Sequence, residues 1–269
     1  MNNMATTIKT KKNAIPFVKL QDGSKYPIVK LLGAGDTNAK MSKSDKSGKG
    51  YLTYGLSLAP GNVSGYEVCP SRSPGCSAAC LYTAGHGQMT SVQRARTAKT
   101  IMFFEQRKAF LAMLERDLDA AHKKATKENK TLAIRLNVLS DIPWESIAPK
   151  LLSKYTDVQK YDYTKSFKRM KKFCAGGFPP NYHLTFSRSE CNDKESLEVL
   201  KMGGNVAVVF DNKDIPKEWN GFKVVNGDET DLRFLDEKGV VVGLFAKGKG
   251  RTDKSGFVVS TKIPLQMAA

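Results

Sequence analysis

The feature that most limits the fold of this 269-residue chain is a regular exchange of strand-like and helix-like segments after residue 130. Strands are predicted at 132–138, 158–163, 182–186, 205–210, 222–225 and 240–245, and helices at 147–155, 193–202 and around the basic stretch 168–172. Because strands that alternate with helices pair in parallel, we expect an α/β protein built from a (β/α) repeat. The sheet is expected to form a partial or complete TIM-like barrel with an N-terminal extension.

The part of the chain before this repeat predicts a further strand, a loop and a long helical region. Residues 52–60 predict a buried strand, and apolar residues at helical spacing from about Ser91 to Lys130 predict one bent helix or two. Residues 1–50 are expected to form a basic, partly flexible extension, with a flexible loop at 41–50. Residues 51–263 are then one barrel-like domain, and residues 264–269 a tail.

Polar residues follow nearly every predicted strand at its carboxyl end. They are Ser140 and Asp141, Thr164 and Lys165, Ser187 and Arg188, Asp211, and Asp228. Folds of the (β/α) type place their chemistry at this edge of the sheet. We therefore expect these side chains to share one mouth that forms the active face, although turns are commonly polar in any fold.

Three of the five cysteines lie within twelve residues of that same mouth. Cys69, Cys76 and Cys80 follow the predicted strand 52–60 in a loop rich in proline and glycine, with the spacing C-x6-C-x3-C. Thiolates in this arrangement are typical of metal sites, either an iron–sulfur cluster or a structural zinc ion. With zinc, His86 is the candidate fourth ligand; with a cluster, three protein ligands leave one iron open.

Two readings of the cysteines without a metal were also weighed. A disulfide framework is disfavoured because the cysteine count is odd, no secretory leader is expected and a chain of this length needs no such crosslink. The other reading is three half-buried free thiols in a tight loop. Cys174 and Cys191 have no close cysteine partner and are expected to be core or surface thiols.

The net charge of +17 predicts an attraction to polyanions, of which nucleic acid is the commonest. Lysine outnumbers arginine, which favours contacts with the phosphate backbone over reading of bases. Arg94, Arg96 and Lys99 follow the cysteine loop and are expected on a solvated helix face, with an anion-facing rim as the alternative. No membrane span is predicted, and the expected location is the cytoplasm of a host cell. The oligomeric state stays open.

From Leu31 to Ile263 the chain resembles the phage "gene product 88" family, whose function is unknown. The resemblance rests on segments 56–60, 92–96, 140–142, 161–165, 184–190 and 232–236 and on the cysteine loop. It implies a bacteriophage protein but no particular chemistry.

Shorter segments resemble a phage-associated family related to radical-SAM enzymes. They are Ser73-Pro74-Gly75-Cys76 after Cys69, the strand ending in Ser140-Asp141, and the strand leading to Thr164-Lys165 before a basic helix. This resemblance implies a 4Fe-4S cluster held by Cys69, Cys76 and Cys80, with S-adenosylmethionine on the open iron. It also implies that Asn137, Ser140 and Asp141 contact that cofactor and that Asp141, Lys165 and Arg188 line the catalytic cavity.

Three functions follow from these observations. The first is an iron–sulfur, radical-SAM-like phage enzyme acting on a nucleic acid or nucleotide. The alternative is a zinc-stabilised nucleic-acid-binding phage protein of DNA replication or metabolism, with Cys69, Cys76, Cys80 and His86 as ligands and no radical chemistry. A third is a barrel enzyme that uses Asp141 or Asp162 for hydrolytic or base-exchange chemistry beside a structural metal.

Overall fold

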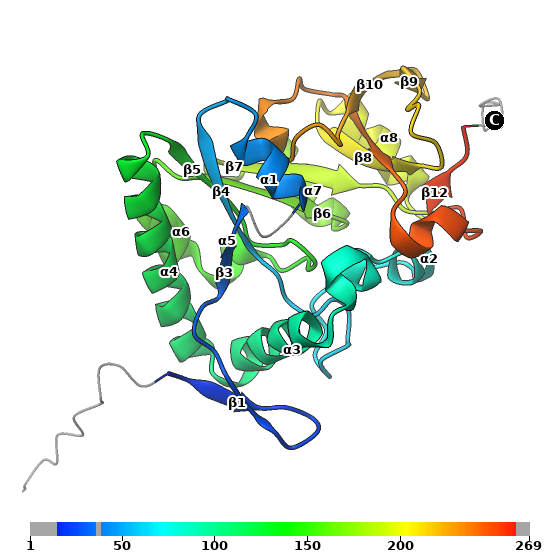
Figure 1. The fold of residues 1–269 in the computed structure, drawn as a ribbon. Coiled ribbons are helices and arrows are strands. Elements are labelled where there is room, and N and C mark those ends of the chain that lie inside the picture. The colour runs from blue at the N-terminus through cyan, green and yellow to red at the C-terminus, as the bar shows by residue number, and fades with distance from the viewer. Residues whose placement is uncertain (1–14, 36–38, 262–269) are drawn as a thin grey trace, which may run out of the picture.

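The computed structural model describes residues 15–35 and 39–261 and consists of one large sheet covered by helices (Figure 1). The helices are α1 Ala39–Asp45, α2 Pro74–Ala78, α3 Thr90–Glu105, α4 Arg107–Lys127, α5 Trp144–Ile147, α6 Pro149–Lys154, α7 Phe167–Cys174 and α8 Asp193–Lys201. Short 3₁₀ turns are η2 Leu81–Thr83, η3 Gly85–Gln88, η4 Arg233–Leu235 and η5 Gly248–Thr252.

Most strands belong to one mixed sheet in which β4 to β8 lie side by side in chain order. The strands are β1 Phe17–Lys19, β2 Lys25–Pro27, β3 Leu32–Ala34, β4 Tyr51–Leu56, β5 Thr131–Arg135, β6 Gln159–Thr164, β7 Tyr182–Ser187, β8 Asn205–Phe210, β9 Glu218–Trp219, β10 Phe222–Asn226, β11 Val241–Phe245 and β12 Val258–Val259. The order across the large sheet is β3-β4-β5-β6-β7-β8-β11-β10-β9, and β12 also pairs with β8. The strands from β4 to β10 along this path are parallel, while β3 and β9 pair antiparallel at the two ends.

The predicted parallel α/β sheet is confirmed, but a closed barrel is not found among the described strands. The path ends at the short strands β3 and β9, which do not pair with each other. The fold is therefore a mixed α/β sheet rather than a complete TIM barrel.

The order of the strands decides which face the helices cover. Each connection from β4 to β8 moves one strand in the same direction, and right-handed crossovers then place all of these helices on one face. The side chains of Leu52, Leu132, Leu184 and Phe186 face them and form the main apolar core with α3, α4 and α7. Trp144 of α5 is fully buried there against Phe103 and Phe110.

The connection from β10 to β11 runs back towards β8, so the same rule places it on the opposite face. We call this the η4 face, because η4 packs there. Phe234 of η4 lies 5.5 Å from the ring of Tyr161 and 5.0 Å from that of Tyr51. Asp231, just before η4, forms an ion pair with Arg135 at 2.8 Å.

Two local predictions need correction. The predicted flexible loop at 41–50 begins as helix α1, which packs on β4, and β3 of the predicted extension belongs to the large sheet. The long helical region is two helices, because the chain breaks at Gln106 between α3 and α4. Residues 1–14 and 264–269 lie outside the described residues.

Within the described ranges, no helix is both long and apolar enough to cross a lipid bilayer.

Candidate functional site

The cysteine loop leaves the carboxyl end of β4 and turns at α2. Ser73 caps this short helix: its hydroxyl oxygen accepts the Cys76 N–H at 3.1 Å, and Pro74 occupies the first helical position, where no N–H is needed. Cys76 lies within α2 and Cys80 directly after it, before η2. Short-range signals in the sequence thus form the turn that carries two of the three thiols.

The three thiols are half-buried and close enough to influence one another. Burial raises the pKa of Cys69 to about 12, although the Gly61 N–H donates to its sulfur at 3.4 Å; the charges of Asp141, Cys76 and Cys80 raise it further. Burial also raises the pKa of Cys80, against the lowering effect of Arg96 and Lys165. The sulfurs are therefore protonated thiols in the absence of a cation, and binding of a metal would release their protons.

The arrangement does not match a single metal ion. Among the described residues, no three His, Cys, Asp or Glu side chains are placed to hold one ion. A zinc ion bound at about 2.3 Å by each sulfur draws its ligands to within roughly 4 Å of one another. His86, the predicted fourth zinc ligand, is exposed on η3. Soft thiols that converge without this tight spacing fit a larger thiophilic centre better than one zinc ion.

Glu190, from the loop after β7, fixes the cysteine loop from the other side. Its carboxylate accepts the Gly75 N–H at 2.7 Å and the Ser73 hydroxyl at 2.8 Å. Burial opposes the charge of Glu190, but these hydrogen bonds outweigh it and lower its pKa. The contact is tight, because a Cβ on Gly75 would lie 2.3 Å from Ser255 Oγ and 2.7 Å from Glu190 Oε2.

The segment 253–258 closes the same side of the site and is held by Arg188. The Arg188 guanidinium donates to the carbonyl oxygens of Gly256 and Phe257 and forms an ion pair with Asp193 at 2.6 Å. In Figure 1 the cyan loop around α2 lies beside this orange-red C-terminal part of the chain. Arg188, predicted to line the cavity, holds a wall of the site in place.

Asp141 and Lys165 meet beside the cysteines, as the shared strand-end edge predicted. The Lys165 backbone N–H donates to Asp141 Oδ2 at 2.8 Å, and its ammonium group donates to Ser187 Oγ at 2.6 Å. The other Asp141 oxygen is bound by Arg169 at 2.7 Å, and Arg169 also binds Glu145. Despite burial, these carboxylates raise the pKa of Arg169. Asp141 is thus a neutralised structural carboxylate rather than a free base.

Asn137 and Ser140 serve the loop after β5. Asn137 Oδ1 accepts hydrogen bonds from the Ser140 hydroxyl, the Ile142 N–H and the Trp144 indole, at 2.8, 2.9 and 3.2 Å. Its Nδ2 donates to the Ile142 carbonyl and to Asp162. With its side chain only 2% exposed and fully committed, Asn137 does not fit the cofactor contact implied by the radical-SAM resemblance.

Asp162, named in the third functional hypothesis, is 1% exposed and accepts hydrogen bonds from the Tyr182 hydroxyl and the Asn137 N–H. Burial raises its pKa to about 6, against these hydrogen bonds. A substrate has no route to this carboxylate within the described structure, which packs it beneath the helices.

The remaining strand-end acids lie apart from the cysteines. Asp211 binds Ser260 and Thr261, and Asp228 accepts from the Lys247 ammonium at 2.5 Å. The expected common mouth therefore gathers the ends of β4 to β7 but not every polar strand end.

A scan against models of protein families matches residues 30–261 to the family described as Gene product 88. The chain belongs to the Gene product 88 family. This match covers almost all of the described residues and supports a bacteriophage protein. No curated protein and no solved structure matches the chain, so neither comparison supports the resemblance to radical-SAM enzymes.

Three features of the site in this family member were not predicted: the clamp formed by Glu190, the wall formed by segment 253–258, and the Arg169 bridge between Asp141 and Glu145. The only sequence signal was the polar run that follows β7, Ser187-Arg188-Ser189-Glu190. All three depend on contacts between residues more than twenty positions apart.

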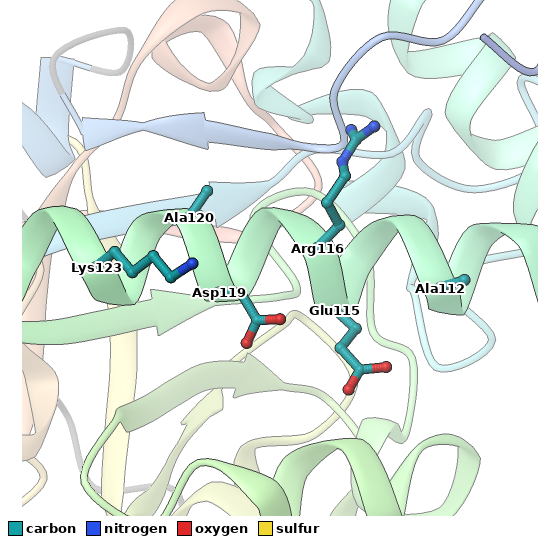
Figure 2. A pocket seen from close by; sticks show the side chains of 6 residues that line it. All are labelled: Ala112, Glu115, Arg116, Asp119, Ala120 and Lys123. Carbon is teal, nitrogen blue, oxygen red and sulfur yellow. The ribbon is translucent and has the colours of Figure 1, made fainter. Parts of the chain in front are cut away.

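A shallow depression on α4 does not belong to this site (Figure 2). It is lined by Ala112, Glu115, Arg116, Asp119, Ala120 and Lys123. Its acidic side chains are occupied, because Lys154 lies 2.7 Å from Glu115 and the Tyr155 hydroxyl donates to Asp119. The depression is a helix surface that packs against α6, not a place for chemistry.

Proposed function

We propose that this Gene product 88 protein binds an iron–sulfur cluster through Cys69, Cys76 and Cys80 and is an enzyme that acts on a nucleic acid or nucleotide. The observation that carries the proposal is the convergence of the three thiols at the carboxyl edge of a parallel sheet. Chemistry is placed at this edge in α/β folds.

The donor set favours a cluster over a single ion. A cluster carries its cysteine ligands on different iron atoms, so its sulfurs lie further apart than those around one zinc ion. The Gly61 N–H donates to the Cys69 sulfur, and hydrogen bonds of this kind stabilise cluster-bound thiolates. Such a cluster supplies redox or Lewis-acid chemistry at an iron that no protein side chain fills.

We assign no step to S-adenosylmethionine. Asn137, Ser140 and Asp141, the residues that the resemblance places beside it, already bind one another's loop, Asp162 and Arg169. The contribution of the chain is to fix the thiols, through Ser73 and Glu190, and to limit water around them, since all three are half-buried.

The charge of the protein supports a polyanionic or nucleotide substrate. The net charge is +17, and α7 begins directly after Lys165 and carries Lys168, Lys171 and Lys172. Lysines attract phosphate as point charges without reading bases. The basic helix thus adjoins the cysteine-containing edge of the sheet.

The test is metal analysis of protein purified without oxygen. We expect about four irons and a similar amount of sulfide per chain, with a broad visible charge-transfer absorbance. Cys76→Ala should lose most of this iron, while Cys191→Ala, which removes an exposed thiol, should keep it. About one zinc per chain in place of iron, lost in the Cys76 variant, would overturn the cluster and support the zinc-stabilised alternative.

A further inference from the structure

Arg96 differs from other buried arginines of the described chain in having no acidic partner. Four nearly buried arginines each bind a carboxylate: Arg135 with Asp231, Arg169 with Asp141 and Glu145, Arg188 with Asp193, and Arg233 with Asp236. Arg96 Nη1 is buried and makes no hydrogen bond within the described structure. A buried guanidinium nitrogen without an acceptor is unfavourable, so the site favours an incoming anion.

The position of Arg96 beside the cysteine loop is fixed by close packing. Its guanidinium carbon lies 5.8 Å from the centre of the Tyr82 ring. A Cβ on Gly87 would lie 3.2 Å from Nη1, so only glycine lets η3 approach the guanidinium this closely. The side chain is therefore preorganised rather than free in solvent.

Lys165 is a second cation without a carboxylate partner in the described residues. Its ammonium group donates to the neutral Ser187 hydroxyl at 2.6 Å and lies 5.4 Å from the centre of the Phe257 ring. Both Lys165 and Arg96 act electrostatically on Cys80, which places the two cations on the same side of the cysteine cluster.

Neighbouring basic residues on α3 are already engaged. Arg94 forms an ion pair with Asp22 at 2.6 Å, and the Lys99 ammonium donates to the Leu31 carbonyl at 2.7 Å. Of the three basic residues that follow the cysteine loop, Arg96 alone keeps an unused buried donor near a thiol.

We propose that Arg96 and Lys165 bind a phosphate group of the substrate next to Cys80. This inference deepens the proposed function, on which it rests, by naming the group that the site recognises. A guanidinium supplies several directed N–H donors to phosphate oxygens, and an ammonium adds a point charge. A phosphate held there brings the attached nucleoside or nucleotide chain to the cysteine cluster.

The test measures binding of inorganic phosphate, adenosine monophosphate and a short oligothymidylate to the full chain by calorimetry at fixed low salt. Arg96→Met and Lys165→Met should each weaken binding at least about tenfold, the expected loss for a charge-assisted hydrogen bond. Arg96→Lys keeps the charge and should recover part of the affinity. Tighter binding of the oligomer than of the monophosphate indicates a nucleic-acid backbone as the source of the phosphate; the reverse indicates a mononucleotide.

Two control variants remove a charge without touching the pair. Arg94→Met removes a cation that is paired on the same helix, and Lys168→Met removes an exposed one on α7. Both should change affinity by less than about twofold. Equal weakening by the controls would show a diffuse surface attraction and overturn the site.

Iron content, measured on the same samples, separates this inference from the proposed function. Protein without iron that still binds phosphate through Arg96 and Lys165 would reject the cluster and keep the phosphate site. Variants that lose iron but bind phosphate as the native chain does would show that the two cations serve the cysteines, and would overturn the phosphate site.

Discussion

The carboxylate of Glu190 accepts the backbone N–H of Gly75 at 2.7 Å, across 115 positions of sequence. The same carboxylate accepts the hydroxyl of Ser73, which caps the helix that carries Cys76. One side chain from the β7–α8 loop therefore sets the position of the cysteine turn.

Replacement of Glu190 should loosen this turn. Glu190→Ala removes both acceptors and should lower the free energy of unfolding by about 1–3 kcal/mol, while Glu190→Gln keeps an acceptor for Gly75 and should lose less. Tryptic cleavage after Arg72 reports opening of the loop and should rise in Glu190→Ala. Glu198→Ala, which removes an exposed carboxylate from α8, is the control and should match the native chain. Unchanged cleavage in Glu190→Ala would show that the turn holds itself.

Gly75→Ala tests how closely the loop is packed. The added Cβ would meet Ser255 Oγ at 2.3 Å and Glu190 Oε2 at 2.7 Å, so the clamp must move. We expect a loss of about 1–3 kcal/mol in urea unfolding. Gly250→Ala is the matched control, because its Cβ would find nothing nearer than 3.7 Å and should be tolerated. Equal stability of the two variants would contradict the tight contact.

Asn137→Ala should unfold the protein more easily whether or not a metal is bound. Five hydrogen bonds of its side chain are lost, and Asp162 and the Trp144 indole lose partners in the core. A loss of at least about 3 kcal/mol is expected by chemical denaturation, against about 1 kcal/mol for Ser140→Ala. A normal unfolding curve combined with impaired cofactor binding would instead support the ligand role that the resemblance implied.

The buried imidazole of His183 predicts sensitivity to acid. Burial, assisted by the charge of Arg233, lowers its pKa from 6.5 to about 4. The unfolded chain therefore binds a proton more readily between these values, and the stability that neutral His183 contributes is present above pH 6.5 and lost as pH falls towards 4. A shift of this size corresponds to roughly 3 kcal/mol.

The measurement compares the free energy of unfolding of the native chain and His183→Gln from pH 7 to pH 4. The difference between them should shrink as pH falls, because the glutamine does not titrate. His86→Gln, in which an exposed side chain changes, should follow the native curve. Parallel curves for the native chain and His183→Gln would refute the assignment.

Much of the fold could be predicted from local patterns. Apolar, β-branched runs such as Val206–Phe210 specify strands wherever they occur, and the handedness of crossovers then orders β4 to β8. Whether the sheet closes could not be predicted. Closure depends on the edges, and β9, with only two residues, carries too little local signal to predict.

The site was predictable only in part, for a similar reason. Clustered cysteines announce themselves in sequence, and strand ends such as Asp141 and Lys165 meet because parallel strands share an edge. The roles of these side chains depend on distant partners. Asn137 looks the same in sequence whether its amide binds a ligand or its own loop, and nothing local couples Glu190 to Gly75.

The C-terminal strand β12 lies beside Val209 and Phe210 of β8. Since β11 occupies the other side of these residues, β12 continues the row that β7 leaves at Ser187. Segment 253–257 is thereby drawn across to Gly75 and Lys165. During translation, the cysteine turn is made long before the wall that encloses it. A nascent chain thus exposes three unprotected thiols on the ribosome, and the enclosed site can mature only after residue 259 has emerged.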